Sequence, residues 1–270
     1  MLELTHVSKT FNPGTINEKK ALTDLTLHVD DGDFITIIGS NGAGKSTLFN
    51  AIGGSFYVDE GYLTLDDTDI TFLPEHKRAS LMGRLFQDPM LGTAPHMSIE
   101  ENLSVAYLRA STSRFAYFSR IGDAERALFR ERLSTLGMGL EDRLDNPVGL
   151  LSGGQRQALS LLMATIVPPQ LLLLDEHTAA LDPATAEKVL QITREIVEEQ
   201  HITCLMVTHN MNQALDMGNR TLMMDAGHIV LDVSGEERSR MHVDDLLSKF
   251  AEVAGRQLSN DRILLSTEVQ

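Results

Sequence analysis

The sequence contains very little cysteine. Only one of its 270 residues is a cysteine, which excludes an internal disulfide framework and is typical of proteins in a reducing cytosol. Cys204 lies in the apolar run Ile202–Val207. We therefore expect it to be a core residue rather than a reactive thiol.

Long apolar runs are also absent. A helix needs about 20 predominantly apolar residues to cross a bilayer, whereas the longest run, Leu159–Val167, is interrupted by Ser160 and Thr165. The N-terminal residues Met1–His6 lack the basic region and apolar core of a signal peptide. These features predict a soluble intracellular protein, which reaches a membrane only through a partner.

Basic residues are scarce as well. Lys and Arg total 23 against 38 Asp and Glu, giving a formal net charge of -15 at pH 7. This balance argues against a general nucleic-acid binder, which needs a basic face to meet phosphates. The segment Arg109–Arg120 is an exception, because it holds arginines and aromatic residues but no acidic one. It is equally consistent with a solvated helix face and with a docking patch for a partner or lipid headgroups.

A glycine-rich segment, Gly39–Thr47, is the most informative feature that is present. It fits G-x-x-x-x-G-K-[ST], the phosphate-binding loop of nucleoside triphosphatases. The apolar run Phe34–Ile38 predicts a strand before it, and Leu48–Ile52 predicts the start of a helix after it. Glycines let successive backbone N–H groups point inward, and a helix N-terminus adds its positive dipole end.

The polar side chains of this loop complete a site for a nucleoside triphosphate with magnesium. Lys45 supplies a full charge to the outer phosphates, the Ser46 hydroxyl suits Mg²⁺, and Thr47 reaches a phosphate oxygen. The candidate nucleotide-binding residues here are Gly39, Ser40, Asn41, Gly42, Ala43, Gly44, Lys45, Ser46 and Thr47.

The strand and helix patterns predict an α/β fold. Alternating apolar residues in the first forty positions favour an antiparallel N-terminal β-subdomain. Residues 88–165 lack strong strand runs and contain helix-like stretches, which predicts an inserted helical subdomain. Strands and helices then alternate in a βαβ pattern, which favours a mostly parallel sheet flanked by helices. The expected elements are helices at Ile99–Leu108 and Asp123–Leu136, a strand at Leu171–Leu174, a helix at Pro183–Gln200, a strand at Ile202–Val207 and a helix at Asn212–Gly218.

The last residues, 241–270, form an appended helical tail behind a main domain of residues 1–240. Its apolar residues fall on one helical face, which predicts a helix packed on the core. They are Val243, Leu246, Leu247, Phe250 and Val253.

A second motif, Leu151–Gln155, reads L-S-G-G-Q and precedes an apolar helix. A serine and two glycines at a helix start offer a hydroxyl, backbone N–H groups and a dipole to an anion. One chain cannot easily bring this site and Gly39–Thr47 onto the same phosphate, since they lie in different subdomains. Two chains arranged head to tail about a two-fold axis can.

With these two motifs the chain resembles the ATPase subunit of ABC transporters over roughly residues 1–240. The resemblance implies ATP and Mg²⁺ as cofactors and a head-to-tail homodimer. It implies that Ser152, Gly153, Gly154 and Gln155 contact the nucleotide bound by the partner copy.

The resemblance extends to the residues of hydrolysis. Leu171–Glu176 matches the Walker B strand, in which Asp175 holds Mg²⁺ and Glu176 acts as general base on the attacking water. Gln87 matches the glutamine loop, whose amide oxygen contacts Mg²⁺ and water. His209 matches the switch histidine, which contacts the γ-phosphate and orients Glu176.

The same resemblance implies roles for two further residues, and the chain departs from the family pattern at one position. Asp182 matches the D-loop, which lies across the dimer interface. Phe11 is the candidate aromatic that stacks on adenine, although a core phenylalanine is the alternative. His177 follows Glu176 where many members have proline, which points to a subgroup.

Several segments are similar to one bacterial import group, in which the ATPase works with a multi-span permease of branched-chain-amino-acid type and an extracytoplasmic binding protein. They include Arg84–Pro89, Met97–Leu103, Asp175–Pro183 and Leu258–Arg262. This similarity predicts import of an amino acid such as tryptophan or tyrosine, with the ATPase held on the inner face of the plasma membrane by the permease.

Two other functions share part of this pattern. An exporter or lipid-trafficking ATPase has the same catalytic residues, so the motifs do not discriminate it. A nucleic-acid- or ribosome-associated ABC ATPase is less consistent, because this chain has one cassette, an acidic balance and no sustained heptads.

Overall fold

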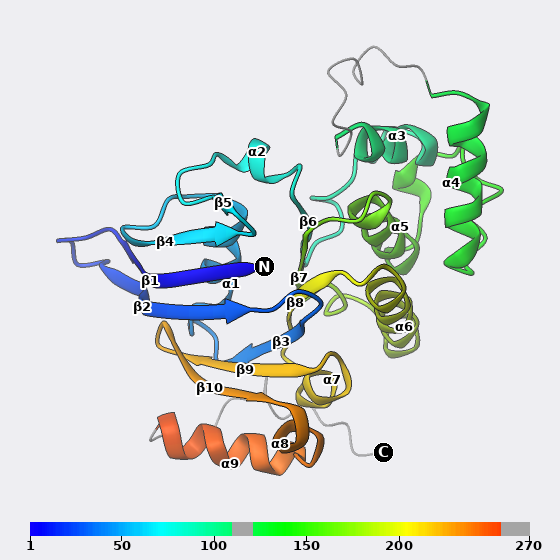
Figure 1. The fold of residues 1–270 in the computed structure, drawn as a ribbon. Helices are drawn as coiled ribbons and strands as arrows, with labels where there is room; N and C mark the ends of the chain where they lie inside the picture. Colours follow the sequence, from blue (N-terminus) through cyan, green and yellow to red (C-terminus); the bar gives the residue numbers. More distant parts are fainter. Residues whose placement is uncertain (110–120, 255–270) are drawn as a thin grey trace. The chain divides into compact units, whose positions relative to one another are not determined.

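The computed structural model describes residues 1–109 and 121–254. The chain divides into two compact units, one formed by Met1–Arg78 with Thr203–Gln270 and the other by Ala79–Ile202. Figure 1 follows the chain through both. The expectations for residues 110–120 and for Leu258–Arg262 lie outside the described residues.

The first unit opens with an antiparallel sheet in the order β2-β1-β4-β5. Leu2 pairs with Val29 on one side and with Leu65 on the other, so three buried side chains lie in one row across the sheet. This confirms the antiparallel N-terminal part. The strands are β1 Leu2–Phe11, β2 Lys19–Val29, β4 Glu60–Leu65 and β5 Thr68–Asp69.

A second sheet of this unit has the order β10-β9-β3-β8. β3 is parallel to both β8 and β9, while β9 and β10 form an antiparallel hairpin. Every residue of β3 and β8 is buried, as expected for strands that are covered on both faces. The strands are β3 Phe34–Gly39, β8 Thr203–Val207, β9 Arg220–Asp225 and β10 His228–Ser234.

Two helices of the first unit begin at or just after residues that the sequence singled out. Helix α1 follows the glycine-rich loop, and α7 begins two residues after His209. Helix α9 packs on the unit core through Leu246, which is fully buried. The helices are α1 Lys45–Gly53, α2 Glu75–Arg78, α7 Met211–Asp216, α8 Gly235–Ser239 and α9 Val243–Ala254.

The second unit combines a parallel strand pair with helices. β6 Met82–Leu85 pairs with β7 Leu171–Asp175. Among the described residues of 88–165 the elements are helical, and Ser98 and Glu101 form the expected capping box at the start of α3. The helices are α3 Ile99–Arg109, α4 Asp123–Thr135, the 3-10 turn η2 Val148–Leu150, α5 Gly153–Thr165 and α6 Pro183–Gln200.

Two of the differences from the expected element boundaries have a clear structural cause. α1 begins at Lys45 rather than Leu48, because the loop runs directly into the first helical turn. α7 ends at Asp216, since Met217 is extended and Gly218 is left-handed at φ 70°. Within the described part of the chain, no helix is both long and apolar enough to cross a membrane.

Candidate nucleotide-binding and hydrolysis site

The loop Gly39–Thr47 follows β3 and leads into α1, as the motif requires. Two of its glycines hold positions that no other residue fits. Gly39 has φ 151°, and a Cβ there would overlap the Met224 carbonyl oxygen. Gly44 has φ 108°, and a Cβ there would lie 2.6 Å from the carbonyl oxygen of Ala21. The loop therefore presents bare backbone to a ligand.

Lys45 is 5% exposed and lies within the curve of the loop. Its Nζ donates hydrogen bonds to the carbonyl oxygens of Gly39 at 2.7 Å and Ser40 at 3.0 Å. The N-cap of α1 is Gly44, which offers no side chain to the first N–H groups of the helix. Those N–H groups and the ammonium together make a strong anion site.

Phe11 is the last residue of β1. Its strand pairs Phe11 with Lys19, whose Nζ lies 3.5 Å from the point where a Cβ on Gly42 would be. The Phe11 ring is half-buried and meets Phe56 edge to face, with ring centroids 5.4 Å apart. The role of Phe11 in stacking on adenine therefore stays a prediction.

His209 lies at the carboxyl end of β8, next to the strand that carries the loop. The parallel register pairs Ile37 with Val207, so Gly39 and His209 are reached two residues later along neighbouring strands. Thr208 donates its hydroxyl to the Gln213 side chain at 2.9 Å, and Asn210 caps α7. His209 is therefore held between two residues that bind the first turn of α7.

Asp175 is the last residue of β7 in the second unit, and Glu176 follows it. The register pairs Leu85 with Leu174, so Gln87 and Glu176 each come two residues after paired positions. Glu176 has a left-handed backbone at φ 47°. Such a conformation is uncommon for a residue with a Cβ and occurs preferentially at functional sites.

His177 is buried behind this strand end, at 3% exposure. Its Nε2 lies 3.2 Å from the Thr193 hydroxyl, which itself donates to the carbonyl of Val189 in α6. Burial lowers the pKa of His177 to about 4. The imidazole is therefore neutral at pH 7 and joins the segment after Glu176 to α6.

Ser152–Gln155 forms the N-terminus of α5 as a capping box. The Ser152 Oγ accepts from the Gln155 backbone N–H at 3.3 Å, and Gln155 Oε1 accepts from the Ser152 N–H at 3.2 Å. The motif predicts anion binding for both glycines, but it does not reveal that Gly154 also has a role in helix packing. A Cβ on Gly154 would overlap Thr185 Cγ2 of α6, so Gly154 is also needed for helix packing.

Asp182 is the N-cap of α6 and accepts a hydrogen bond from the Thr185 N–H at 3.1 Å. Hydrogen bonds from Thr185 hold the pKa of the Asp182 carboxyl below its ordinary value. Because the Thr185 N–H binds Asp182 and the Thr185 methyl group lies against Gly154, one residue contacts both the D-loop and the L-S-G-G-Q motif.

The predicted residues are thus positioned in two groups. The first unit places the loop Gly39–Thr47 and His209 at the carboxyl ends of the neighbouring strands β3 and β8, and Phe11 at the end of β1 in its other sheet. The second unit places Gln87, Asp175 and Glu176 at the ends of one strand pair.

The comparisons with known proteins identify the chain. A family model described as "ABC transporter" matches residues 22–179, more than half of the chain. The "Tyrosine transport ATP-binding protein" of Clostridioides difficile (strain R20291) is 44% identical over 251 residues, which are 93% of this chain and 98% of that protein. The chain belongs to the ABC transporter family.

Other ABC proteins support this assignment at lower identity. The "Phosphonates import ATP-binding protein PhnC" of Lactococcus lactis subsp. cremoris (strain SK11) is 32% identical over 92% of this chain and 99% of its own. A dimeric post-hydrolysis structure of the ATP-binding cassette MJ0796 with ADP and Pi superposes with TM-score 0.74. It is 28% identical, over 87% of this chain and 98% of that chain.

This ABC chain is an ATP-binding and ATP-hydrolysing enzyme of the transporter family. Its α/β fold, with an antiparallel sheet, a sheet built on parallel strands and flanking helices, is the fold of ABC cassettes, as the sequence predicted.

Proposed function

We propose that the chain powers an importer for an amino acid, with tyrosine or a similar aromatic amino acid as the substrate class. One observation carries this proposal, namely the 44% identity to a tyrosine transport ATP-binding protein over almost the whole length of both chains. Relatives named as import ATP-binding proteins for methionine and for spermidine/putrescine support the direction of transport.

ATP binding begins at Lys45, whose ammonium neutralises the outer phosphates while the N–H groups of Gly39–Thr47 surround them. The Phe11 ring stacks on the adenine. The support within the first unit is that Lys19, the strand partner of Phe11, extends its Nζ toward Gly42 of the loop.

A magnesium ion completes the nucleotide. The proposed ligands are Ser46, Gln87 and Asp175, which offer a hydroxyl, an amide carbonyl and a carboxylate. These are all hard oxygen donors of the kind that Mg²⁺ prefers, and the single carboxylate leaves coordination positions for phosphates and water. When bound, the ion neutralises charge that develops on the phosphates during transfer.

Hydrolysis is proposed to depend on Glu176 and His209. The Glu176 carboxylate accepts a proton from the attacking water as it approaches the γ-phosphorus. His209 contacts the γ-phosphate and orients the water. The left-handed backbone of Glu176 and the clamped loop of His209 supply the rigid placement that such chemistry requires.

A second copy of the chain supplies the remaining contacts. Ser152–Gln155 of one copy covers the nucleotide on Gly39–Thr47 of the other, and Asp182 lies across the interface. The support is the N-terminus of α5, a 13-residue helix whose first turn carries two glycines.

The proposed membrane partner is a multi-span permease, which places the chain on the inner face of the plasma membrane. An extracytoplasmic binding protein delivers the substrate. A pocket of about 170 Å³ in the second unit includes Phe86 and Pro89, which flank Gln87, together with Val105 from α3. We assign it to a cytoplasmic helix of the permease.

The chemistry of this pocket favours an apolar residue next to a carboxylate. Arg84 and Arg109 line it beside apolar side chains, and both guanidinium groups are charged at neutral pH. Leu91 and Val105 nearby are 70% and 58% exposed, as expected for residues that a partner covers. Of the segment Arg109–Arg120, Arg109 alone is described, so the assignment of the whole segment stays a proposal.

The proposed domain organisation follows this division of labour. Residues 1–240 form the ATPase domain, with 88–165 as the helical subdomain that meets the permease, and 241–270 form the tail.

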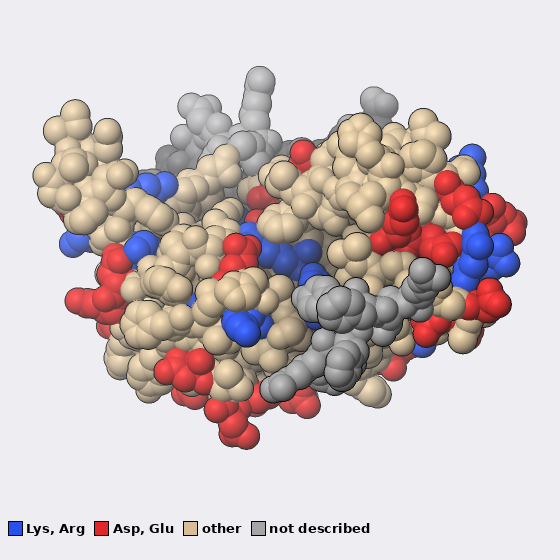
Figure 2. Space-filling view, turned by 90° about the horizontal axis from the view of Figure 1, so that it is seen from above, with Lys and Arg blue, Asp and Glu red and all other residues tan. Residues whose placement is uncertain are grey.

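On the face drawn in Figure 2, the described residues show scattered acidic groups among fewer basic ones. This distribution favours the transporter over the nucleic-acid-associated alternative.

The experiment is affinity purification of tagged Glu176→Gln protein from detergent-solubilised membranes with ATP, followed by identification of the co-purifying chains. A multi-span permease together with a binding protein supports the importer, and the binding protein then becomes the target of an amino-acid ligand screen. Recovery of a permease without any binding protein supports the exporter or lipid-trafficking function, and ribosomal or DNA-associated partners contradict both.

A further inference from the structure

Arg238 from α8 lies at the C-terminal end of α7, the helix that begins just after His209. Its Nη2 donates to three backbone carbonyls there, those of Ala214 at 3.0 Å, Leu215 at 2.9 Å and Met217 at 2.5 Å. The last carbonyls of a helix have no partner within the helix, and α7 has no basic residue of its own in its last turn. Arg238 therefore supplies the C-terminal cap of α7.

The same guanidinium also ties α7 to the sheet. Arg238 Nε donates to the Thr221 hydroxyl of β9 at 2.9 Å. That hydroxyl donates to the Ala214 carbonyl at 3.1 Å, and the Thr36 hydroxyl of β3 reaches the same carbonyl at 2.7 Å. Both threonines are fully buried. A charged donor in such a network is worth more than a neutral one.

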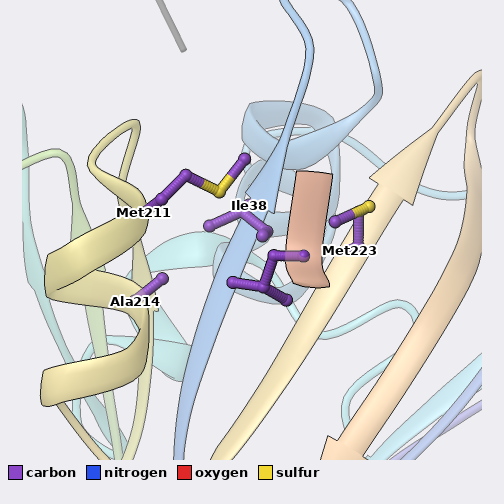
Figure 3. Close-up of a cluster of buried hydrophobic side chains, with 5 residues drawn as sticks. Ile38, Met211, Ala214 and Met223 are labelled. Carbon is purple, nitrogen blue, oxygen red and sulfur yellow. The ribbon is translucent and has the colours of Figure 1, made fainter. Parts of the chain in front are cut away.

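Apolar packing holds the opposite side of α7. Figure 3 shows Met211 and Ala214 of α7 beside Ile38 of β3 and Met223 of β9. Leu246 of α9 completes this buried cluster. With only six residues, α7 is too short to be stable by itself. Its position is therefore set by these tertiary contacts.

The N-terminal end of α7 in turn fixes His209. Asn210 Oδ1 accepts from the N–H groups of Asn212 and Gln213 at 2.9 and 3.2 Å. On the other side of His209, the Thr208 hydroxyl donates to the Gln213 side chain. The Thr208 backbone N–H donates to the Ile37 carbonyl at 3.1 Å. A shift of α7 along its axis would move Asn210 and strain the contact between Thr208 and Gln213, and so would disturb the segment that carries His209.

We propose that Arg238 is a positioning residue for ATP hydrolysis, acting on His209 through α7. The proposal rests on the role assigned to His209 under the proposed function. It extends the hydrolytic machinery to the C-terminal part of the chain, beyond the residues that contact ATP.

The test is a double-mutant cycle on the full chain. ATP hydrolysis is measured for R238Q and R238K, each in the natural background and together with H209A, with Tm and ATP affinity measured in parallel. R238Q is expected to lower kcat about 10-fold while KM changes less than about 2-fold, since His209 is one of many contacts that hold ATP but is required to orient the attacking water. R238K is expected to recover part of the loss, because an ammonium still donates to the same carbonyls.

In the H209A background, R238Q is expected to lower the residual kcat by less than about 2-fold. The matched control is R240Q, which removes an exposed arginine two residues away that pairs with Glu236, and its kcat should equal that of the natural chain. If R238Q fails to fold, the same cycle is carried out with R238K, whose loss of kcat must likewise disappear with H209A.

The outcomes separate the two proposals. Equal losses of kcat from R238Q in both backgrounds, or no loss in either, overturn the role of Arg238. A natural kcat in H209A alone overturns instead the role given to His209.

Discussion

Arg78 donates two hydrogen bonds from Nη1, each of 2.7 Å, to the carbonyl oxygens of Ala51 and Ile52. Both carbonyls lie in the last turn of α1, the helix whose first residue is Lys45. A buried cation at the negative end of α1 complements the anion expected at its positive end. Two further carbonyls, of Thr71 and Leu73, accept from the same side chain.

We expect Arg78→Met to destabilise the protein by about 3 kcal/mol or more, because it leaves buried carbonyls without donors. Urea unfolding of the full chain measures the change. Lys77→Met is the control, since it removes an exposed charge one residue away. Equal midpoints for the two variants would contradict a structural role for the Arg78 hydrogen bonds.

Glu176→Gln is expected to retain ATP binding and to lose about 10²-fold or more in kcat, because an amide cannot accept the proton of the attacking water. Phosphate release and nucleotide binding by the same preparation measure the two quantities. The control Glu187→Gln changes an exposed carboxylate of α6 and should leave kcat unchanged. Normal turnover by Glu176→Gln would exclude it as the general base.

Gly154→Ala is expected to destabilise the protein by about 1–3 kcal/mol, the usual cost of overpacking, because its Cβ overlaps Thr185 Cγ2. Thr185→Ser removes that methyl group and keeps the backbone N–H that binds Asp182. In the Thr185→Ser background, Gly154→Ala should therefore cost much less in thermal unfolding. An unchanged cost would show that the methyl group is not the obstacle.

His177 predicts a pH dependence of stability. The unfolded chain protonates this imidazole below about pH 6.5, whereas the folded state resists protonation until its pKa of about 4. The unfolded state thus binds more protons in this window, so stability falls as pH drops from 6.5 toward 4. A shift of this size corresponds to on the order of 3 kcal/mol.

The measurement is urea unfolding between pH 7 and 4. His177→Gln, which keeps a donor for Thr193 but does not titrate, should lose less stability over this range than the natural chain. His76→Gln, a change at an exposed histidine, should behave like the natural chain. The pH effect would have another origin if the His177→Gln curve kept the natural slope.

We expect binding of the proposed permease helix to the pocket beside Gln87 to depend on the exposed apolar residues at the rim of that pocket. Val105→Asp should prevent co-purification of the permease, because it introduces a charge into the surface that the permease helix buries. ATP hydrolysis by the isolated chain should not change. Phe72→Asp, which alters another exposed apolar residue, in the first unit, is the control, and permease loss with both variants would contradict a specific docking surface.

The sequence predicted the elements well wherever a local motif defined them. The motif Gly39–Thr47 predicted a strand before the loop and a helix after it, because a phosphate-binding loop needs that context. The structure has β3 and α1 at these positions. The burial of Cys204 is likewise confirmed, and burial raises the pKa of its thiol well above the ordinary value. Local composition was enough in both cases.

Contacts between distant segments could not be predicted in the same way. Arg78 and Arg238 each cap a helix that lies about 20 residues or more away in the chain, and no spacing rule connects them to it. Gly154 matched a motif, which concealed its contact with Thr185. The roles given to Phe11 and Asp182 stay predictions, because they concern a ligand and a partner copy.

Thr185 links the first turns of α5 and α6. Its methyl group lies against Gly154 at the start of α5, while its N–H holds Asp182 at the start of α6. The two segments proposed to meet the partner copy therefore cannot slide past one another. We therefore expect them to engage and release the partner copy together, which makes separation of the two copies after hydrolysis one concerted step rather than two successive ones.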